Sequence, residues 1–256
     1  MTLPIILIMA GGLGKRMCSD LPKVLHLVQG KPMLVHVIES SWKLSPQKII
    51  IIVGKYRSII EQTLRDRLNT KIFDQLEFAI QQEANGTGNA IKCALSNLID
   101  YSNNEIPTLI LSGDTPLVTT QTMKLLLQDF SNARIMTTQL EDPSGYGRVI
   151  INNNKFQKIV EHKDCNNKQL LIKHINTGIY SVSLKLLKEY IPKINNNNSQ
   201  QEYYLTDLFS LLQYNNIPIQ VYEMPIKDQL QLTGINTKDQ LDQLNKLLEV
   251  NFLRQI

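Results

Sequence analysis

A short apolar run near the N-terminus, residues 5–9, is followed at once by a loop rich in glycine and then by cationic side chains. Such a run is typical of a buried strand. Glycines let the backbone approach a ligand closely and turn its N–H groups toward an anion, and the cations add positive charge where phosphates would lie. The pattern predicts a phosphate-binding loop, and the alternative is a tight turn whose cations face water. The residues concerned are Gly11, Gly12, Gly14, Lys15, Arg16 and Lys23.

The spacing of this loop argues against two common phosphate-binding motifs. A P-loop needs a glycine, four residues and then Gly-Lys-Ser/Thr, but Arg16 follows Gly14-Lys15 and Met9 stands five positions before Gly14. A dinucleotide-binding fingerprint would require a third glycine at Met17. Neither a P-loop NTPase nor a dehydrogenase is therefore favoured.

Apolar runs alternate with amphipathic segments through the first half of the chain. Strands are predicted at residues 3–9, 48–53, 76–80 and 106–111, and helices at 31–44, 57–68, 87–98 and 119–130. This alternation predicts βαβ units and a mostly parallel sheet. The loops after the first, third and fourth strands should then converge at one edge of the sheet.

The second half has a different pattern, with short connections between its strands. Strands are predicted at residues 135–140, 147–151, 156–161, 174–182 and 217–224, and helices at 203–212 and 238–250. Short connections between strands favour a mixed or antiparallel extension of the sheet.

Composition narrows the class of protein. The net charge of +4 and pI of about 8.8 are too mild to indicate nucleic acid, and no basic stripe is interleaved with aromatic residues. Cys18, Cys93 and Cys165 share no metal-binding or redox spacing, which favours reduced thiols. The N-terminal apolar run is too short for a signal peptide or a membrane span. We therefore expect a soluble cytoplasmic protein with neither nucleic-acid nor membrane partners.

The segments from Ala10 to Met17 and from Leu21 to Lys23 resemble the signature loop of the sugar-1-phosphate nucleotidyltransferases. Continued through Val24-Leu25-His26, the similarity is closest to the N-terminal uridyltransferase domain of the bacterial bifunctional N-acetylglucosamine-1-phosphate uridyltransferase/glucosamine-1-phosphate acetyltransferase. It runs from about residue 3 to 250 with the motifs in the family's order. Those relatives also carry a C-terminal left-handed β-helix for acetyl transfer, but hexapeptide repeats are absent from this sequence. Only the uridyltransferase step is expected here.

This resemblance implies a Rossmann-like three-layer α/β/α nucleotidyltransferase fold, with a mostly parallel mixed sheet and a smaller β-rich sugar-binding extension. The chain of 256 residues is expected to form a single nucleotidyltransferase domain. Residues 1–133 would form the nucleotide-binding half, residues 134–236 the sugar-binding half, and residues 237–256 a C-terminal helix.

The resemblance also implies a nucleotide site. Arg16 and the loop amides would hold the leaving phosphates, and Lys23 would bridge the sugar phosphate and the α-phosphate. A glutamine amide suits the imide edge of uracil, so Gln81 is expected to contact the base. Ala84 stands where the family would have a second glutamine, which leaves the nucleotide open, and Gln82 is an alternative source of that amide. The remaining nucleotide-binding residues are Met9, Ala10, Gly11, Gly12, Gly86 and Thr87.

A magnesium ion is the cofactor that the resemblance implies. Asp114 follows a predicted strand, where a carboxylate can hold Mg²⁺ or simply cap a turn. The segment from Gly234 to Thr237 resembles the family's Gly-Val-Asn-Asn, so Asn236 would supply the second oxygen. An asparagine before a helix is more often a cap, and Asp228 is an alternative ligand.

The sugar site rests on four further motifs in the second half, the last of which, residues 201–207, could also be the first turn of a helix. Taken singly, each fits a turn, a solvated charge run or a strand end, but their order matches the sugar-binding half of the family. The residues expected to contact N-acetylglucosamine are Gly147, Glu161, Asn176, Thr177, Glu202 and Tyr204.

The predicted reaction is Mg²⁺-dependent transfer of UMP from UTP to N-acetylglucosamine 1-phosphate, which yields UDP-N-acetylglucosamine and pyrophosphate. A related enzyme that uses another sugar 1-phosphate, dTTP or CTP is the first alternative. A non-catalytic sensor of nucleotide sugars is the second. The sequence does not define an oligomeric state.

Overall fold

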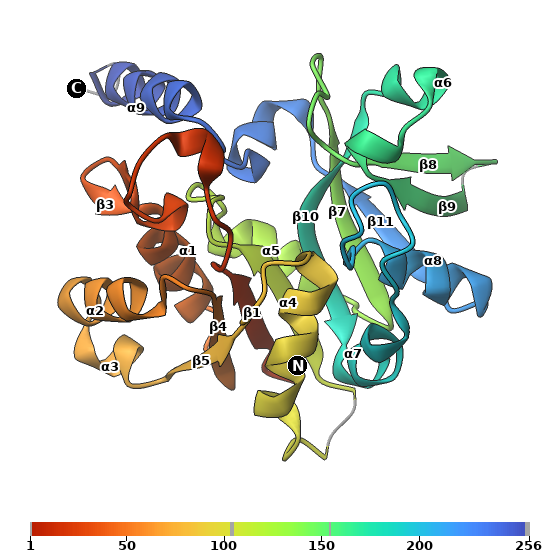
Figure 1. Cartoon of the computed structure of the whole chain (residues 1–256), viewed down its shortest axis with the longest axis horizontal. Coiled ribbons are helices and arrows are strands. Elements are labelled where there is room, and N and C mark those ends of the chain that lie inside the picture. The colour runs from red at the N-terminus through yellow and green to blue at the C-terminus, as the bar shows by residue number, and fades with distance from the viewer. Residues whose placement is uncertain (1, 103–104, 154, 254–256) are drawn as a thin grey trace.

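A mixed β-sheet occupies the centre of the molecule, with helices on both of its faces (Figure 1). The computed structural model describes residues 2–102, 105–153 and 155–253, and nine strands in this part of the chain form the sheet. Its main order is β11 (Ile219–Glu223), β7 (Ala133–Gln139), β10 (His174–Ser183), β6 (Pro107–Ser112), β1 (Ile5–Met9), β4 (Lys48–Val53) and β5 (Leu76–Ile80).

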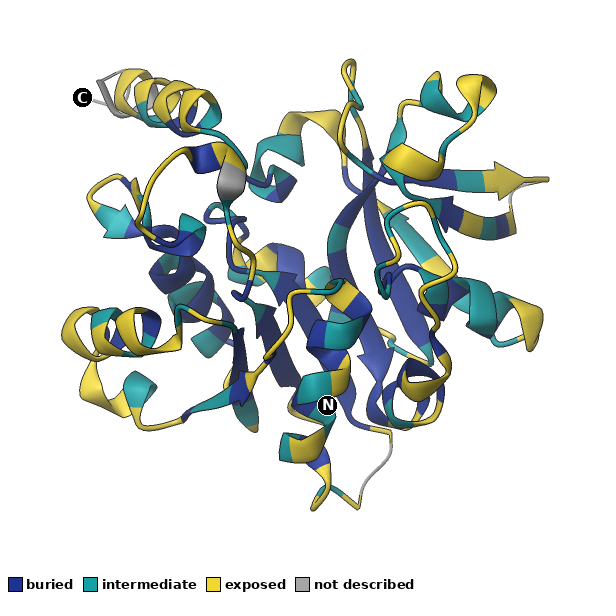
Figure 2. Cartoon of the chain, in the orientation of Figure 1, coloured by how far each residue is buried: buried dark blue, intermediate teal, exposed yellow. Residues whose placement is uncertain are grey.

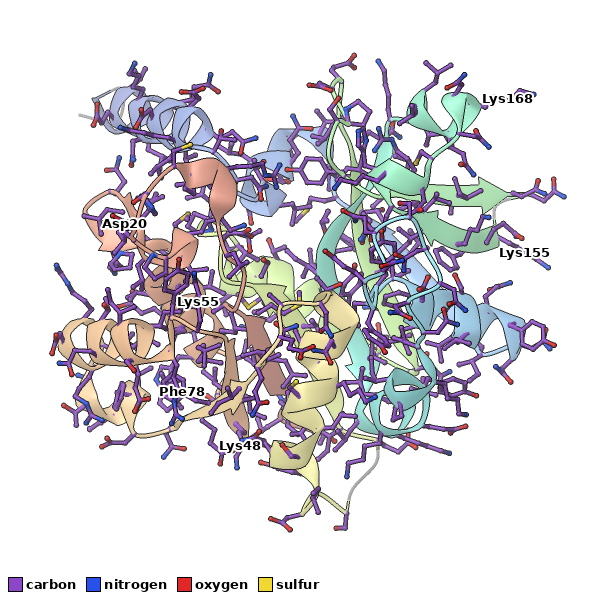
Figure 3. All side chains as sticks on the ribbon, in the orientation of Figure 1. Asp20, Lys48, Lys55, Phe78, Lys155 and Lys168 are labelled. Carbon is purple, nitrogen blue, oxygen red and sulfur yellow. The ribbon has the colours of Figure 1, made fainter. Side chains whose placement is uncertain are left out.

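Strand β10 runs opposite to its neighbours in an otherwise parallel order. β1 is parallel to β4 and β6, β4 to β5, and β11 to β7, whereas β10 is antiparallel to β6 and β7. A hairpin of β8 (Arg148–Asn152) and β9 (Lys155–Val160) branches from β10. The predicted mostly parallel mixed sheet with a smaller β-rich extension is confirmed. Figure 3 shows Lys155 on β9 and Lys168 on the neighbouring helix α6 (Asn167–Leu170), across the molecule from Asp20 and Lys55.

Alternate residues of each strand face opposite helical layers. On β1, Ile5 and Leu7 belong to one apolar core, and Ile6 and Ile8 to the other. Strands covered on both faces need apolar residues at every position, which explains the uninterrupted apolar runs. Figure 2 shows these strands as the most buried part of the molecule. The first core includes α4 (Thr87–Ala94), α7 (Leu184–Tyr190) and α8 (Asp207–Tyr214), and the second includes α1 (Met33–Trp42), α2 (Arg57–Arg67) and α5 (Thr120–Leu127).

The C-terminal helix α9 (Lys238–Leu253) packs beside a short hairpin that the sequence did not predict, β2 (Leu27–Val28) and β3 (Lys31–Pro32). The Asn245 side chain joins them, because it donates to the Leu27 carbonyl at 3.1 Å and accepts from the Gln29 amide at 3.0 Å. The predicted helix is therefore present as far as Leu253, and its last three positions, 254–256, lie outside the described residues.

The helix predicted over residues 203–212 begins instead at Asp207 and ends at Tyr214. The backbone of Tyr203 is hydrogen-bonded to a loop more than a hundred residues earlier, at Asn85 and Gly88, and cannot also start a helix. The helix predicted over residues 87–98 also differs, because its last turn, Leu95–Leu98, is a 3₁₀ helix. Three short helices were not predicted: α3 (Thr70–Phe73), α6 (Asn167–Leu170) and α7.

Two expectations from composition can be compared with the structure. None of the helices in the described ranges is both long and apolar enough to cross a bilayer. Cys18, Cys93 and Cys165 are free thiols, as expected. Burial raises the pKa of the Cys93 and Cys165 thiols, which lowers their thiolate fraction.

Candidate active site

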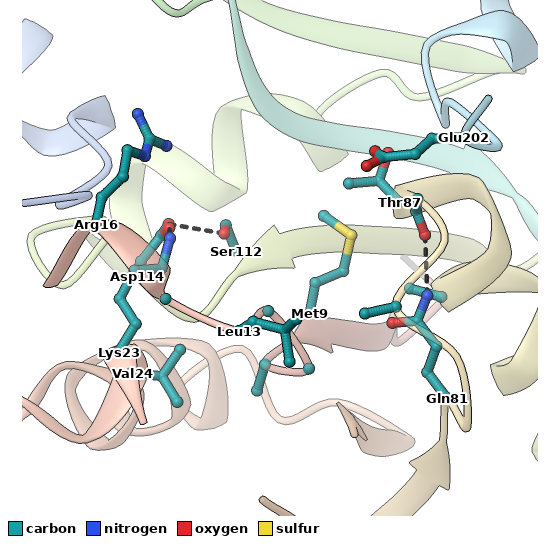
Figure 4. Close-up of a pocket in the computed structure, with 17 residues that line it drawn as sticks. Met9, Leu13, Arg16, Lys23, Val24, Gln81, Thr87, Ser112, Asp114 and Glu202 are labelled. Carbon is teal, nitrogen blue, oxygen red and sulfur yellow. Dashed lines mark hydrogen bonds and ion pairs between the residues drawn. The ribbon is translucent and has the colours of Figure 1, made fainter. Parts of the chain in front are cut away.

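A cavity of about 560 Å³ opens where β1, β5 and β6 end (Figure 4). The loops after the first, third and fourth predicted strands converge here, as expected for the carboxyl edge of a parallel sheet. All seven residues predicted to bind nucleotide line the cavity, together with both predicted catalytic residues, one metal ligand and one sugar-binding residue. They are Met9, Ala10, Gly11, Gly12, Gln81, Gly86 and Thr87, with Arg16, Lys23, Asp114 and Glu202.

One end of the cavity carries a cluster of charged and amide groups. The Lys23 ammonium forms an ion pair with Asp114 Oδ2 and donates to Asn236 Oδ1 at 3.1 Å. Arg16 Nη2 donates to the same Asn236 oxygen at 3.1 Å. Arg16 and Lys23 therefore meet Asn236 across more than two hundred residues of sequence, and Asp114 joins the cluster through Lys23. The side chain of Lys15, the remaining cation of the loop, lies outside what the structure describes.

The backbone holds this cluster together from both halves of the chain. The Ile235 amide donates to the Asp114 carbonyl at 2.9 Å, which fixes the segment from Gly234 to Asn236 against the end of β6. Burial raises the pKa of the nearby Tyr146 hydroxyl, and the Gly234 amide acts in the opposite direction. The Lys23 ammonium that pairs with Asp114 also contacts Asn236, and not Asp228, the alternative metal ligand.

The oxygen atoms at this end fit a magnesium ion. Asp114 Oδ2 and Asn236 Oδ1 converge on one ammonium, so two hard oxygen donors already face a common cation. No group of three or more His, Cys, Asp or Glu side chains able to hold a metal occurs among the described residues. Mg²⁺ is commonly bound by one or two protein oxygens together with substrate phosphates and water. The cluster therefore suits a metal that is completed by a phosphate ligand.

The opposite end of the cavity is formed around Gln81. This buried amide donates through Nε2 to the Gly86 carbonyl at 3.0 Å (Figure 4). Its Oε1 remains an acceptor, suited to the imide N–H of uracil or thymine. Ala84 lines the cavity whereas Gln82 is exposed, so the structure does not favour Gln82 as the replacement for the missing glutamine.

The loop after β5 is joined to a segment of the second half. The Tyr203 amide donates to the Asn85 carbonyl at 2.9 Å, and the Gly88 amide donates to the Tyr203 carbonyl at 2.7 Å. The Leu205 amide donates to Thr87 Oγ1 at 3.0 Å. The Thr87 hydroxyl is thus used to hold the two halves together.

Three of the predicted sugar-binding residues form a cluster of their own. Gly147 lies close to both Glu161 and Asn176, because a Cβ added to it would be 3.5 Å from Glu161 Oε2 and 3.6 Å from Asn176 Cβ. The backbone N–H of Asn176 also donates to the Gly147 carbonyl at 2.9 Å. Asn176 Nδ2 also donates to the Tyr180 hydroxyl at 2.6 Å. These three residues are close enough to act on one ligand, but they are not among those that line the 560 Å³ cavity.

The other predicted sugar-binding residues differ in their surroundings. The Thr177 hydroxyl donates to the Met136 carbonyl at 2.7 Å, and the Tyr204 hydroxyl accepts from Gln200 Nε2 at 2.8 Å, so both groups already have protein partners. Glu202 lines the cavity and also a second, more open hollow that contains His162 and Cys165. Glu202 therefore borders both hollows.

Two residues at the site were not predicted from the sequence. Ser112 Oγ donates to Asp114 Oδ1 at 2.7 Å and leaves Oδ2 toward Lys23 (Figure 4). A hydroxyl two positions before a carboxylate at a strand end could have indicated this contact, because such residues share a face. Thr206 Oγ1 donates to Glu161 Oε1 at 2.8 Å, and no local pattern connects these two residues.

The buried Glu161 should make stability depend on pH. Burial raises the pKa of this carboxyl, against the hydrogen bond from Thr206. A carboxyl whose pKa is higher in the folded state binds its proton more tightly there than in the unfolded state. Its protonation therefore stabilises the folded state fully below the unfolded pKa of about 4.3, and this stabilisation is lost as pH rises through the folded pKa. Glu161→Gln mimics the protonated form, and we expect its free energy of unfolding to exceed that of the wild type increasingly from pH 4 to pH 8.

Urea unfolding at several pH values measures this difference. Glu141→Gln makes the same change at a carboxyl whose side chain is 93% exposed, and serves as the control for general charge effects. A difference between Glu161→Gln and wild type that stays constant or shrinks with rising pH would contradict the expectation.

The arrangement places a glycine-rich loop, two cations and an oxygen pair at the carboxyl edge of a parallel sheet, as in an enzyme that handles nucleotide phosphates. A family model described as "Nucleotidyl transferase" matches residues 5–220, and the chain belongs to this family.

Similar proteins within the family cover most of the chain. It is 41% identical over 250 residues to the probable UDP-N-acetylglucosamine pyrophosphorylase of Acanthamoeba polyphaga mimivirus, which covers 94% of this chain and 95% of that protein. It is 41% identical over 216 residues to the bifunctional protein GlmU of Bordetella petrii, which covers 84% of this chain and 46% of GlmU. The chain therefore spans about half the length of the GlmU relatives, and the predicted resemblance is confirmed.

A solved structure supports the fold. UDP-glucose pyrophosphorylase complexed with UDP-glucose superimposes with a TM-score of 0.74 at 18% identity, over 97% of this chain and 99% of that chain. At this identity the similarity concerns the fold alone.

Proposed function

We propose that this protein is a cytoplasmic uridylyltransferase that makes UDP-N-acetylglucosamine and pyrophosphate from UTP and N-acetylglucosamine 1-phosphate, with Mg²⁺ as cofactor. The observation that carries the proposal is one cavity with Gln81 at one end and Arg16, Lys23 and Asp114 at the other. The names of the mimivirus and GlmU relatives support the choice of substrates.

The reaction needs positioning and charge neutralisation rather than a protein nucleophile. The sugar phosphate supplies its own oxygen nucleophile, and the α-phosphorus must be held in line with it. We assign the loop amides and Arg16 to the leaving β- and γ-phosphates, and Lys23 to the α-phosphate and the sugar phosphate. Mg²⁺ held by Asp114 and Asn236 would offset the repulsion between the two anionic reactants.

The two halves contribute unequally in this proposal. Residues 1–133 supply the glycine loop, Gln81 and Asp114, and residues 134–236 supply the cluster around Glu161 together with Asn236. The sugar moiety would occupy the region between Glu202 and that cluster. The nucleotide and sugar sites are not fully separated between the two halves, because Glu202 of the second half lines the same cavity as Gln81.

The second candidate is a related enzyme with a different base or sugar. Ala84 favours it, because this residue lines the cavity with Gln81 but has no amide with which to select a base. A base with an imide N–H, such as thymine, would suit Gln81 Oε1 as well as uracil does, whereas cytosine lacks this donor.

Pyrophosphate release decides between these candidates. We expect the highest kcat/KM with UTP, Mg²⁺ and N-acetylglucosamine 1-phosphate, and lower values when dTTP or CTP replaces UTP, or when glucose 1-phosphate or glucosamine 1-phosphate replaces the acceptor. A higher value with another pair would transfer the assignment to that pair. Tight binding of a nucleotide sugar without any pyrophosphate release would support a sensor instead.

A further inference from the structure

The Lys23 ammonium lies at the position that the proposed magnesium ion would require. It pairs with Asp114 Oδ2 and donates to Asn236 Oδ1 at 3.1 Å, and these are the two protein oxygens assigned to the metal. Both partners of the ion pair are largely buried, with side chains 16% and 11% exposed. Burial reduces solvent screening, so this pair is stronger than one on an open surface.

A divalent cation and this ammonium cannot share the two oxygens. Both would lie within bonding distance of Asp114 Oδ2 and Asn236 Oδ1, and like charges this close repel strongly in a partly buried site. Arg16 adds a second positive group, because its Nη2 donates to Asn236 Oδ1 at 3.1 Å. A metal ion can therefore bind only if the Lys23 ammonium moves away from both oxygens and Arg16 Nη2 moves away from Asn236 Oδ1.

We propose that Lys23 occupies the metal site of the unliganded protein as a built-in counter-ion, and that a divalent cation binds by displacing it. The displaced ammonium then becomes available for the phosphates of the substrates. Only the later contact between Lys23 and the substrate phosphates rests on the proposed function. The competition between Lys23 and the metal ion for the two oxygens does not, because it involves the protein and the metal alone.

The structure allows this exchange because only the end of the lysine has to move. Lys23 begins a buried 3₁₀ turn, Lys23–Leu25, and its Cβ lies so close to Gly14 that a side chain at Gly14 would collide with it. The backbone is thus fixed, whereas the four-carbon stem is flexible. Ser112 holds Asp114 Oδ1 at 2.7 Å, so the carboxylate keeps its orientation while Oδ2 changes partners.

Binding of Mn²⁺ alone, measured as free Mn²⁺ by electron paramagnetic resonance without nucleotide, tests the competition. Lys23→Met removes the ammonium and keeps an apolar stem of similar length. We expect this variant to bind one Mn²⁺ about tenfold more tightly than the wild type, which corresponds to ~1.4 kcal/mol. Arg16→Met removes only a contact with Asn236, and a smaller gain is expected.

Two controls make the result specific to this site. Lys31→Met also removes a lysine from an ion pair, that with Glu39, and should leave Mn²⁺ binding at the wild-type level. The double variant Lys23→Met with Asp114→Asn should lose the gain, since it lacks the carboxylate. Urea unfolding checks that each variant is folded, and Lys23→Gln replaces Lys23→Met if the latter is not.

A folded Lys23 variant that binds Mn²⁺ no more tightly than Lys31→Met would overturn the proposal. A gain that persists in the double variant would also overturn it, because the metal would then bind elsewhere. Absence of pyrophosphate release from the wild type would instead refute the proposed function, and would leave the gain in Mn²⁺ affinity as a separate observation.

Discussion

Replacement of Lys23 by alanine is expected to lower kcat/KM for pyrophosphate formation by about 10²–10³-fold, on the scale of losing one preorganised electrostatic contact to a transition state. The reason is that both reactants carry phosphates, and the α-phosphorus gains its stabilisation from cations already in place. Lys23 lines the cavity, and once the metal displaces its ammonium from Asp114 and Asn236 the lysine is free to make this contact.

The measurement is steady-state pyrophosphate release at saturating Mg²⁺, with the folded state verified by urea unfolding. Lys31→Ala is the matched control, because it removes a lysine from the Lys31–Glu39 ion pair outside the cavity, and its kcat/KM should remain near the wild-type value. Undiminished turnover by a folded Lys23→Ala variant would exclude this lysine from the chemistry.

Gly86→Ala is expected to reduce the free energy of unfolding by roughly 3 kcal/mol and to abolish nucleotide binding. Gly86 has φ +115°, a conformation that other residues rarely adopt, and an added Cβ would lie 2.6 Å from the Tyr203 amide nitrogen. The collision would separate the loop after β5 from the segment after Glu202. It would break the hydrogen bonds that Tyr203 makes with Asn85 and Gly88 and would release the Gly86 carbonyl that holds Gln81.

Urea unfolding and UTP titration measure the two effects. Gly30→Ala is the control for backbone conformation alone, because Gly30 has φ +75° but nothing lies within 4 Å of its added Cβ. This control should lose only about 1–2 kcal/mol and should bind UTP normally. Equal losses of stability in both variants would show that the contact with Tyr203 contributes little.

The first half of the fold could be predicted closely because its strands are buried on both faces. The bounds of β4 (Lys48–Val53) agree with the apolar run in the sequence, since every position after Lys48 is buried. Those of β5 (Leu76–Ile80) also agree, although this edge strand is only partly buried. The start of α8 could not be predicted, because the backbone of Tyr203 is paired with distant residues rather than with its own next turn. The β2–β3 hairpin was missed because it is short and is held by Asn245 of α9.

The residues of the site also divide into those that the sequence could predict and those that it could not. The proximity of Gln81 and Asp114 could be predicted because each follows a recognisable strand and the loops after parallel strands meet at one edge, whereas their roles came from the family resemblance. Ser112 and Thr206 were missed because each acts through a carboxylate that it orients, at Asp114 and Glu161. The role of Gln82 could not be judged from the sequence, because only the structure shows that Ala84, and not Gln82, faces the cavity.

The amino-acid pattern alone determined the alternating layers, the glycine-rich loop and the set of charged residues, because these depend on local periodicity and on chemistry that each residue carries with it. The tertiary structure decided which charges meet. Asn236 joins Arg16 and Lys23 only because the Ile235 amide is bound to the end of β6, more than a hundred residues earlier in the chain. Electrostatic interactions depend on distance and burial, and neither quantity is defined until the chain has folded.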